Sequence, residues 1–298
     1  MAAIVVMALA GCSTAAATTP PTLPVDYSFL TGFAAGYSAP ETPPPGANVP
    51  CVPSSHHPDP VVLVHGTAEN QDDNWQALSP LLVDNGYCVY SFNYGGAAPD
   101  SSIQGTGDIP TSAGQLATFV SQVLASTHAE KVDIVGHSQG GMMPLYYLKF
   151  LGGASKVNDL VGLSPSNHGT TVFGLLTLVS SLPDGLGTDL LDSGCVACAQ
   201  QTAGSPFLQT LNGGGDTVPG VAYTVIETEY DEVVTPYTSA FLSGPDVTNI
   251  TLQNQCPDDF SDHLTTPYDP NALHDVLNAL DSATATPVQC VPVAPFAS

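Results

Sequence analysis

The stretch Val132-Asp133-Ile134-Val135-Gly136-His137-Ser138-Gln139-Gly140-Gly141 decides the fold of this chain. Its first four residues predict a short hydrophobic strand, and the apolar positions from Met142 to Leu151 predict a helix directly after the glycines. A strand, a tight Gly-x-Ser-x-Gly turn and a helix in this order are typical of a nucleophile elbow. The two glycines permit the close approach of strand and helix that such a turn requires. Ser138 is thereby placed at the carboxyl edge of a sheet, whereas the alternative interpretation is an ordinary glycine-rich turn.

Aliphatic runs alternate with segments of helical period on both sides of this turn. The expected strands cover residues 61–64, 87–92, 132–135, 160–163, 221–226 and 247–252. The expected helices lie around residues 75–82, 116–124 and 142–151, and a closing helix begins at Asp269-Pro270 and reaches Leu280. This alternation predicts an α/β fold with a mostly parallel central sheet and helices on both faces. We expect residues 25–298 to form a single catalytic domain.

The N-terminal region is expected to lie outside the packed part of the fold. Residues 1–24 are interpreted as an export signal or tail, since an apolar stretch ends in Leu9-Ala10-Gly11-Cys12. This ending resembles a bacterial lipoprotein processing site, although the positively charged leader of such signals is missing, so plain secretion and a lipid anchor on Cys12 are both open. Residues from about 25 to 60 are rich in Pro, Ala and Thr, which favours an extended surface arm over a packed helix.

The charge balance excludes several classes of function. The 298 residues contain 27 acidic side chains but only three Lys and Arg, which gives a formal net charge of -24. Such a surface cannot neutralise a phosphate backbone or adhere electrostatically to anionic lipid, so nucleic-acid binding is excluded. No apolar run has the 18 or so residues that a membrane-spanning helix needs. We expect an exported monomer kept soluble by charge repulsion.

The chain contains seven cysteines, a number that suggests disulfides and one unpaired residue in an exported protein. Cys12 is the natural odd one, because it lies in the segment that is removed or lipidated. Three bridges are then expected among the other six, and the sequence alone leaves their connectivity open: Cys51, Cys88, Cys195, Cys198, Cys256 and Cys290. A zinc site at Cys195-Val-Ala-Cys198 is disfavoured, since no second pair of ligands has suitable spacing.

The segment from Val172 to Leu182 is apolar around its whole circumference and is flanked by Gly and Pro. In most chains such a segment is a buried helix. The functional alternative is a mobile cover or a hydrophobic wall over an apolar site.

An acyl-transfer serine needs hydrogen-bond donors for the developing oxyanion. One donor usually comes from the residue after the nucleophile, here Gln139, and another from a loop after an earlier strand. The strand 61–64 opens into His65-Gly66-Thr67, where Gly66 lets the backbone turn and Thr67 can offer its amide and its hydroxyl. His65 is interpreted as structural, because it lies at a strand end on this side of the site.

The order serine, acid, histidine along the chain is typical of this fold class. It leaves His168, His263 and His274 of the eight histidines as candidate bases. His263 is preferred, because it lies in a loop after the last expected strand, where its side chain can reach over the strand ends. Asp231 is preferred as the acid that orients it, with Glu232 and then Glu229 as competitors.

Five motifs together give the chain a family resemblance from about Val25 to Cys290. They are VLVHGT at 62–67, GHSQGG at 136–141, LSPSNHGT at 163–170, CAQQ at 198–201 and YDEVVTP at 230–236. In this combination the chain resembles the secreted actinobacterial triacylglycerol lipases. More distantly, it is similar to fungal lipase B of the Candida antarctica type.

This resemblance implies an α/β-hydrolase fold, a triad of Ser138, Asp231 and His263, and an oxyanion hole of Thr67 and Gln139, with no metal and no cofactor. It also implies disulfides Cys51–Cys88 and Cys256–Cys290, which leaves Cys195–Cys198 as a local bridge. The substrate-binding residues that it implies are Gln201, His137 and Ser166. The fungal enzyme has a tryptophan in place of His137 and an aspartate in place of Ser166, so its substrate range does not carry over.

The function that follows is hydrolysis of lipid or other carboxylic esters through an acyl-enzyme on Ser138. A cutinase-like polyester hydrolase and an acyltransferase share this chemistry and stay as alternatives. A catalytically silent surface protein on the same fold is a remote third, because Ser138, Asp231, His263 and Thr67 are all present.

Overall fold

The computed structural model of the protein describes residues 22–181, 187, 190 and 194–295. Cys12 and most of the expected export signal lie outside this range. Within it, six strands form one parallel sheet in the order β2-β1-β3-β4-β5-β6. The strands are β1 (Val61–Val64), β2 (Val89–Ser91), β3 (Val132–His137), β4 (Val157–Leu163), β5 (Ala222–Glu227) and β6 (Val247–Thr251).

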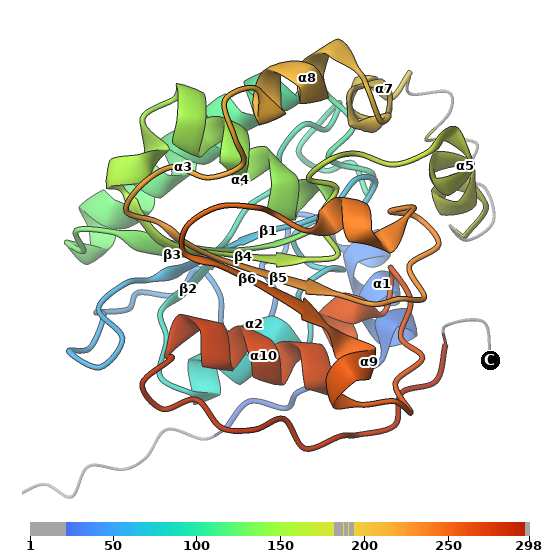
Figure 1. Cartoon of the computed structure of the whole chain (residues 1–298). Coiled ribbons are helices and arrows are strands. Elements are labelled where there is room, and N and C mark those ends of the chain that lie inside the picture. Colours follow the sequence, from blue (N-terminus) through green and yellow to red (C-terminus); the bar gives the residue numbers. More distant parts are fainter. Residues whose placement is uncertain (1–21, 182–186, 188–189, 191–193, 296–298) are drawn as a thin grey trace, which may run out of the picture.

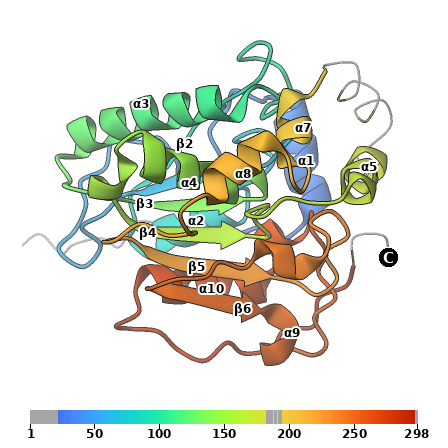
Figure 2. The same ribbon diagram turned by 45° about the horizontal axis from the view of Figure 1, so that its top comes forward.

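Helices cover both faces of this sheet, as Figures 1 and 2 show. One face carries α3 (Ile109–Thr127) and α4 (Gln139–Phe150), with the short α7 (Val196–Gln201) and α8 (Pro206–Asn212) above them. The other face carries α2 (Leu78–Asp84) and α10 (Pro270–Leu280). The remaining helices are α1 (Phe29–Ser38), α5 (Val172–Ser181) and α9 (Leu252–Gln255), with 3-10 turns at Gly153–Ser155, Tyr237–Ala240 and Thr266–Tyr268.

The strand side chains divide the core into two layers. In β1, Val62 and Val64 pack with α3 and α4, whereas Val61 and Leu63 pack with α2 and α10. Successive side chains of a strand point to opposite faces, so a strand covered on both sides is apolar throughout. The predicted α/β fold with a parallel sheet is therefore confirmed.

The expected extended arm is wrong for residues 29–38, which form helix α1. The Ser28 side chain accepts a hydrogen bond from the Thr31 amide and caps this helix, and Phe29 packs edge-on against Tyr268 with ring centroids 5.8 Å apart. Tertiary packing on Tyr268 thus overrides the extended preference of the proline-rich flanks. The short helices α7 and α8 were also not predicted.

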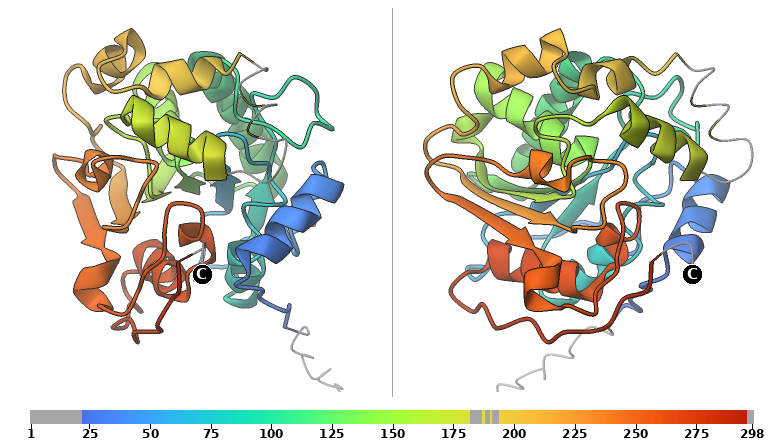
Figure 3. Two further views of the ribbon diagram at one scale, coloured as in Figure 1. Left: turned by 90° about the vertical axis from the view of Figure 1, so that its right-hand side faces the viewer. Right: turned by 45° about the vertical axis from the view of Figure 1, so that its right-hand side comes forward.

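Helix α5 is exposed on one side, which contradicts the expectation of a buried helix. Leu178 is buried, but Phe173 is 81% exposed and Leu176 is 52% exposed. Figure 3 shows α5 in front of the carboxyl ends of the strands, on the same side of the molecule as α1. The alternative expectation of a cover or wall over the site stays a prediction.

Three disulfides join the pairs that the resemblance implies. They are Cys51–Cys88, Cys195–Cys198 and Cys256–Cys290. The last bridge joins Cys256, directly after α9, to Cys290 near the C-terminus. The part of the chain between these two cysteines contains His263. In the described residues, no helix is both long and apolar enough to cross a membrane.

Candidate active site

Ser138 lies in a strained turn between β3 and α4. Its backbone angles are φ 53° and ψ -121°, outside the regions that L-residues usually adopt. A side chain at Gly136 would collide with the backbone of Gly140, and one at Gly140 would collide with the backbone of Val64 and His65 at the end of β1. The two glycines therefore do what the sequence predicts of them, since they let α4 start directly against the sheet.

Asp231 and His263 lie in contact after β5 and α9. Asp231 Oδ2 is 2.7 Å from His263 Nδ1, and both side chains are buried. Asp231 Oδ1 accepts hydrogen bonds from the amides of Val233 and Val234, so the carboxylate is held in one orientation. The competitor Glu232 instead accepts a hydrogen bond from the His263 amide at 3.4 Å. The Glu229 amide donates to Gln253, and among the described residues no hydrogen bond joins Glu229 to His263.

The electrostatic surroundings favour a protonated imidazole at His263. Burial alone would lower the pKa of this residue, but the charge and hydrogen bond of Asp231 oppose it. With smaller contributions from Glu232 and Glu69, they raise the pKa of His263 to about 9. A group with this environment is suited to hold the proton that it takes from a nucleophile.

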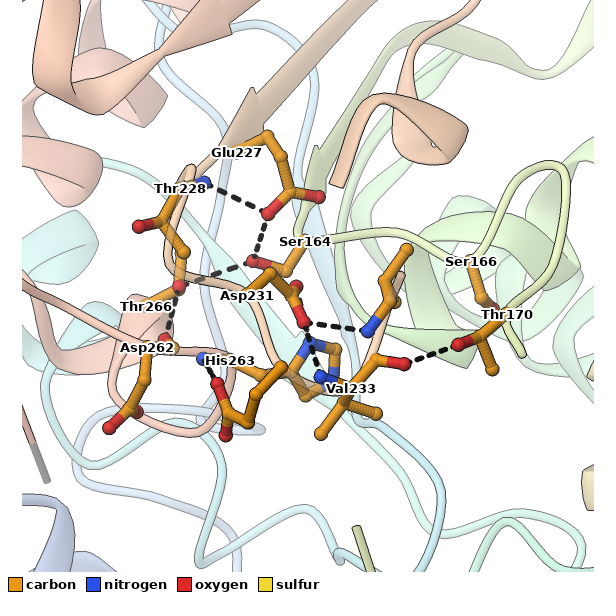
Figure 4. Close-up of polar contacts among 12 residues, drawn as sticks. Ser164, Ser166, Thr170, Glu227, Thr228, Asp231, Val233, Asp262, His263 and Thr266 are labelled. Atoms are coloured by element: carbon orange, nitrogen blue, oxygen red, sulfur yellow. Dashed lines mark hydrogen bonds and ion pairs between the residues drawn. The ribbon is translucent and has the colours of Figure 1, made fainter. Parts of the chain in front are cut away.

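A hydrogen-bonded chain ties the loop of His263 to the ends of β4 and β5, as Figure 4 shows. Glu227 accepts from the Thr228 amide and from the Ser164 hydroxyl, which also contacts the Thr266 hydroxyl. Burial and the nearby charge of Asp231 raise the pKa of Glu227 well above its usual value. Asp262 Oδ1 accepts a hydrogen bond from the Thr265 amide at 3.0 Å.

Thr67 and Gln139 lie side by side, as expected for a pair of oxyanion donors. The Thr67 hydroxyl donates to Gln139 Oε1 at 2.9 Å. Across the residues that the structure describes, neither the Thr67 amide nor the Gln139 amide has a hydrogen-bond partner. The Gln139 amide lies at the start of α4 and directly follows Ser138. A free amide in such a place, together with the free Thr67 amide, can stabilise a developing negative charge.

Gln201 and Ser166 belong to the same polar network. Gln201 Nε2 donates to Thr67 Oγ1 at 2.8 Å and to Gln139 Oε1 at 2.9 Å, and Gln201 Oε1 accepts from the Ser166 hydroxyl at 2.8 Å. Helix α7 thus brings Gln201 over the candidate oxyanion donors. Four of the predicted residues meet here, although their contact with a substrate stays a prediction.

His137 also lies at the site, but its ring faces the protein. Its ring centroid is 4.9 Å from that of His263, and its two nitrogens contact Glu69 Oε2 at 2.8 Å and the His263 carbonyl at 3.0 Å. Burial would raise the pKa of Glu69, but the charge and hydrogen bond of His137 hold it below its usual value. The predicted contact of His137 with a substrate stays a prediction.

Sequence reasoning missed Glu69, Tyr94 and Glu227, each of which is buried at the site. Tyr94 accepts from Gln139 Nε2 at 3.2 Å and donates to the His65 carbonyl at 2.6 Å. Glu69 lies in the polar run 69–74, which has the composition of a solvated loop yet is buried throughout. The one available signal was its position directly after the His65-Gly66-Thr67 turn.

The parallel sheet and the strand, serine turn and helix at its centre define the α/β-hydrolase fold. Solved structures with this likeness include Aspergillus fumigatus lipase B, with a TM-score of 0.55, 24% identity, and coverage of 80% of this chain and 56% of that one. Bacillus licheniformis lipase BlEst2 in its propeptide form has a TM-score of 0.54 and 17% identity, and covers 85% of this chain and 54% of that one. Both likenesses concern the fold.

Comparison of the sequence assigns the chain to a family. Residues 58–269 match the family Lipase (class 2), so the chain belongs to this family. A triacylglycerol lipase of Pseudarthrobacter phenanthrenivorans is 40% identical over 92 residues, which are 29% of this chain and 27% of that protein. A triacylglycerol lipase of Burkholderia plantarii is also 40% identical over 92 residues, which are 29% of this chain and 24% of that protein. The matches therefore span about a quarter of the length of these curated relatives.

Proposed function

We propose that this protein is an exported carboxylic-ester hydrolase that cleaves triacylglycerol esters through an acyl-enzyme on Ser138. The observation that carries the proposal is the contact of Asp231 with His263, together with the elbow turn at Ser138, whose neighbour His137 has its ring centroid 4.9 Å from that of His263. Membership of the class 2 lipase family supports the same activity. The three disulfides support export, since such bridges persist in oxidising compartments.

The reaction uses each candidate residue in a separate role. His263 takes the proton of the Ser138 hydroxyl, and the serine oxygen attacks the ester carbonyl. The Thr67 and Gln139 amides stabilise the oxyanion of the tetrahedral intermediate. His263 then gives its proton to the departing alcohol, and water attacks the acyl-enzyme by the same route. Asp231 holds the tautomer of His263 that carries a proton on Nδ1 and stabilises the imidazolium.

Two features favour a long apolar acyl chain over a small polar ester. Helix α5 begins beside the triad, because the Thr170 hydroxyl donates to the Val233 carbonyl two residues after Asp231. Its side chains Val172, Phe173 and Leu176 are exposed and offer an apolar surface on the helix that follows this contact. An exposed apolar surface beside a reactive centre is suited to hold an alkyl chain.

The test is hydrolysis of a p-nitrophenyl ester series from short to long chains by the wild-type protein and by Ser138→Ala. We expect hydrolysis that the variant loses, together with labelling of the wild type alone by an organophosphonate. A preference for long chains supports a lipase, whereas activity confined to short chains contradicts the triacylglycerol assignment. Transfer to an added alcohol in preference to water would assign an acyltransferase. A disulfide-bonded protein without activity or labelling would leave a silent member of the fold.

A further inference from the structure

The carboxylate of Glu69 contacts the turn before Thr67 and the ring of His137. Its Oε2 accepts a hydrogen bond from the Gly66 amide at 2.9 Å and lies 2.8 Å from His137 Nδ1. Glu69 is only 6% exposed, and a side chain at Gly66 would collide with its Oε2. Because Gly66 directly precedes Thr67, this contact fixes the turn that carries one of the two free amides.

His137 continues the contact to the loop of the base. Its Nε2 lies 3.0 Å from the backbone carbonyl of His263. A peptide carbonyl can only accept, so Nε2 of His137 donates to it. Asn74 completes the group, since its Oδ1 accepts from the Gly66 amide at 3.1 Å and its Nδ2 is 3.2 Å from His137 Nδ1.

We propose that Glu69 and His137 act as one positioning unit that fixes the oxyanion turn relative to the backbone of His263, an inference that rests on the proposed function. The oxyanion donors and the general base come from distant parts of the chain, and their relative position must be fixed to within about 0.5 Å. In the described part of the chain, the Glu69 carboxylate makes its hydrogen bonds to Gly66 and His137, and both nitrogens of His137 are occupied by protein. The pair therefore works through Thr67 and His263.

The carboxylate of Glu69 is essential to this role. Its Oε2 is shared by the Gly66 amide and His137 Nδ1, and hydrogen bonds to an ionised acceptor are about twice as strong as those to a neutral one. A glutamine at this position has the same shape but no charge, so both contacts weaken.

The first test compares Glu69→Gln with the matched control Asp72→Asn. Asp72 is a buried carboxylate in the same loop, but it accepts a hydrogen bond from Gln76 and is not part of the unit of Glu69 and His137. With soluble p-nitrophenyl butyrate, we expect kcat of Glu69→Gln to fall roughly 10- to 100-fold, with KM within about twofold of wild type. We expect Asp72→Asn to keep both constants within about twofold. An unchanged kcat in Glu69→Gln, or an equal fall in the control, overturns the proposal.

The second test is a double-mutant cycle with His137→Gln. If both residues form one unit, breaking it twice costs no more than breaking it once, so the double variant should resemble the slower single variant. Multiplying losses in kcat would overturn the proposal. Circular dichroism checks that each variant is folded. Should Glu69→Gln fail to fold, His137→Gln alone must still lower kcat at constant KM, and a wild-type kcat there also overturns the unit.

These outcomes are separate from failure of the proposed function. An inactive wild-type protein would contradict the ester hydrolase itself, before any variant is compared. An active wild type with an active Glu69→Gln would retain the hydrolase and remove only the positioning unit.

Discussion

The polar centre and helix α5 are neighbours with opposite character. Thr67, Gln139 and Gln201 at the centre are buried and hydrogen-bonded to one another. Helix α5 begins beside them, yet it exposes Phe173 and Leu176. The two regions are joined through Thr170, whose hydroxyl contacts the Val233 carbonyl and whose amide donates to the Gln201 carbonyl.

This difference indicates a division of labour. Buried polar networks hold atoms in fixed positions, because each lost hydrogen bond leaves a costly unsatisfied group. An exposed apolar surface fixes nothing by itself but is suited to meet an apolar ligand. Changes at the centre should therefore alter the rate for every ester, whereas changes on α5 should alter the preference among esters.

The largest expected effect is that of Asp231→Asn. The asparagine oxygen can still accept from the amides of Val233 and Val234, so its NH2 group faces His263 Nδ1 and enforces the wrong tautomer. We expect kcat to fall about 10⁴-fold for short and long esters alike, with little change in thermal stability. Glu232→Gln, which removes a carboxylate next to it in the chain, should lose less than about tenfold. Comparable losses of kcat in both variants would contradict the assignment of Asp231 as the acid of the triad.

The second prediction concerns pH. A general base must be unprotonated, and the pKa of His263 is raised to about 9 from its usual 6.5. Below this pKa, kcat/KM should fall roughly tenfold per pH unit, so the rate at pH 7 should be about one hundredth of the alkaline plateau. The profile should be the same for short and long esters, since it belongs to the centre. A midpoint near 6.5 in the pH dependence of kcat/KM contradicts this electrostatic assignment.

The third prediction concerns Thr67→Val, which removes the hydroxyl but keeps the shape and the backbone amide. Gln201 Nε2 and Gln139 Oε1 then lose a shared partner. We expect kcat to fall about tenfold for every ester, because the amide donors remain while the network around them loosens. Thr106→Val provides a control, since its hydroxyl contacts only the Gly95 carbonyl in the described structure. If the loss depends on chain length, Thr67 acts on the acyl chain instead of the oxyanion.

The parts that the sequence predicts are those whose signals are local. The strand at Val132 and the glycines around Ser138 specify their own geometry, and the neighbouring strands follow from hydrophobic runs covered on both faces. Helix α1 was missed because its stability depends on Phe29 meeting Tyr268, which is distant in the chain. Periodicity could not reveal which side of α5 is exposed, since that helix is apolar all round.

The candidate site divides in the same way. Chain order and loop position selected Asp231 and His263, and the structure brings these two into contact. The buried position of Glu69 could not be predicted from the sequence, because a polar run after a turn has the same composition whether it is solvated or buried. Only the folded chain places its carboxylate between Gly66 and His137.

The smallest expected effect is that of Phe173→Ser on α5. Because this ring is 81% exposed, its removal should leave the melting temperature and the rate for p-nitrophenyl butyrate unchanged. For a palmitate ester we expect kcat/KM to fall about three- to tenfold, since an apolar contact of this kind is worth on the order of 1 kcal/mol. The ratio of the two rates is the measurement.

Val52→Ser is the matched control, because Val52 is 87% exposed and lies next to Cys51, in the segment before β1. It should leave the ratio at its wild-type value. An unchanged ratio in Phe173→Ser would remove α5 from substrate selection, and a fall with both esters would place Phe173 in the centre. Either result would end the division of labour, because it requires that α5 discriminate among esters without altering the chemistry that they share.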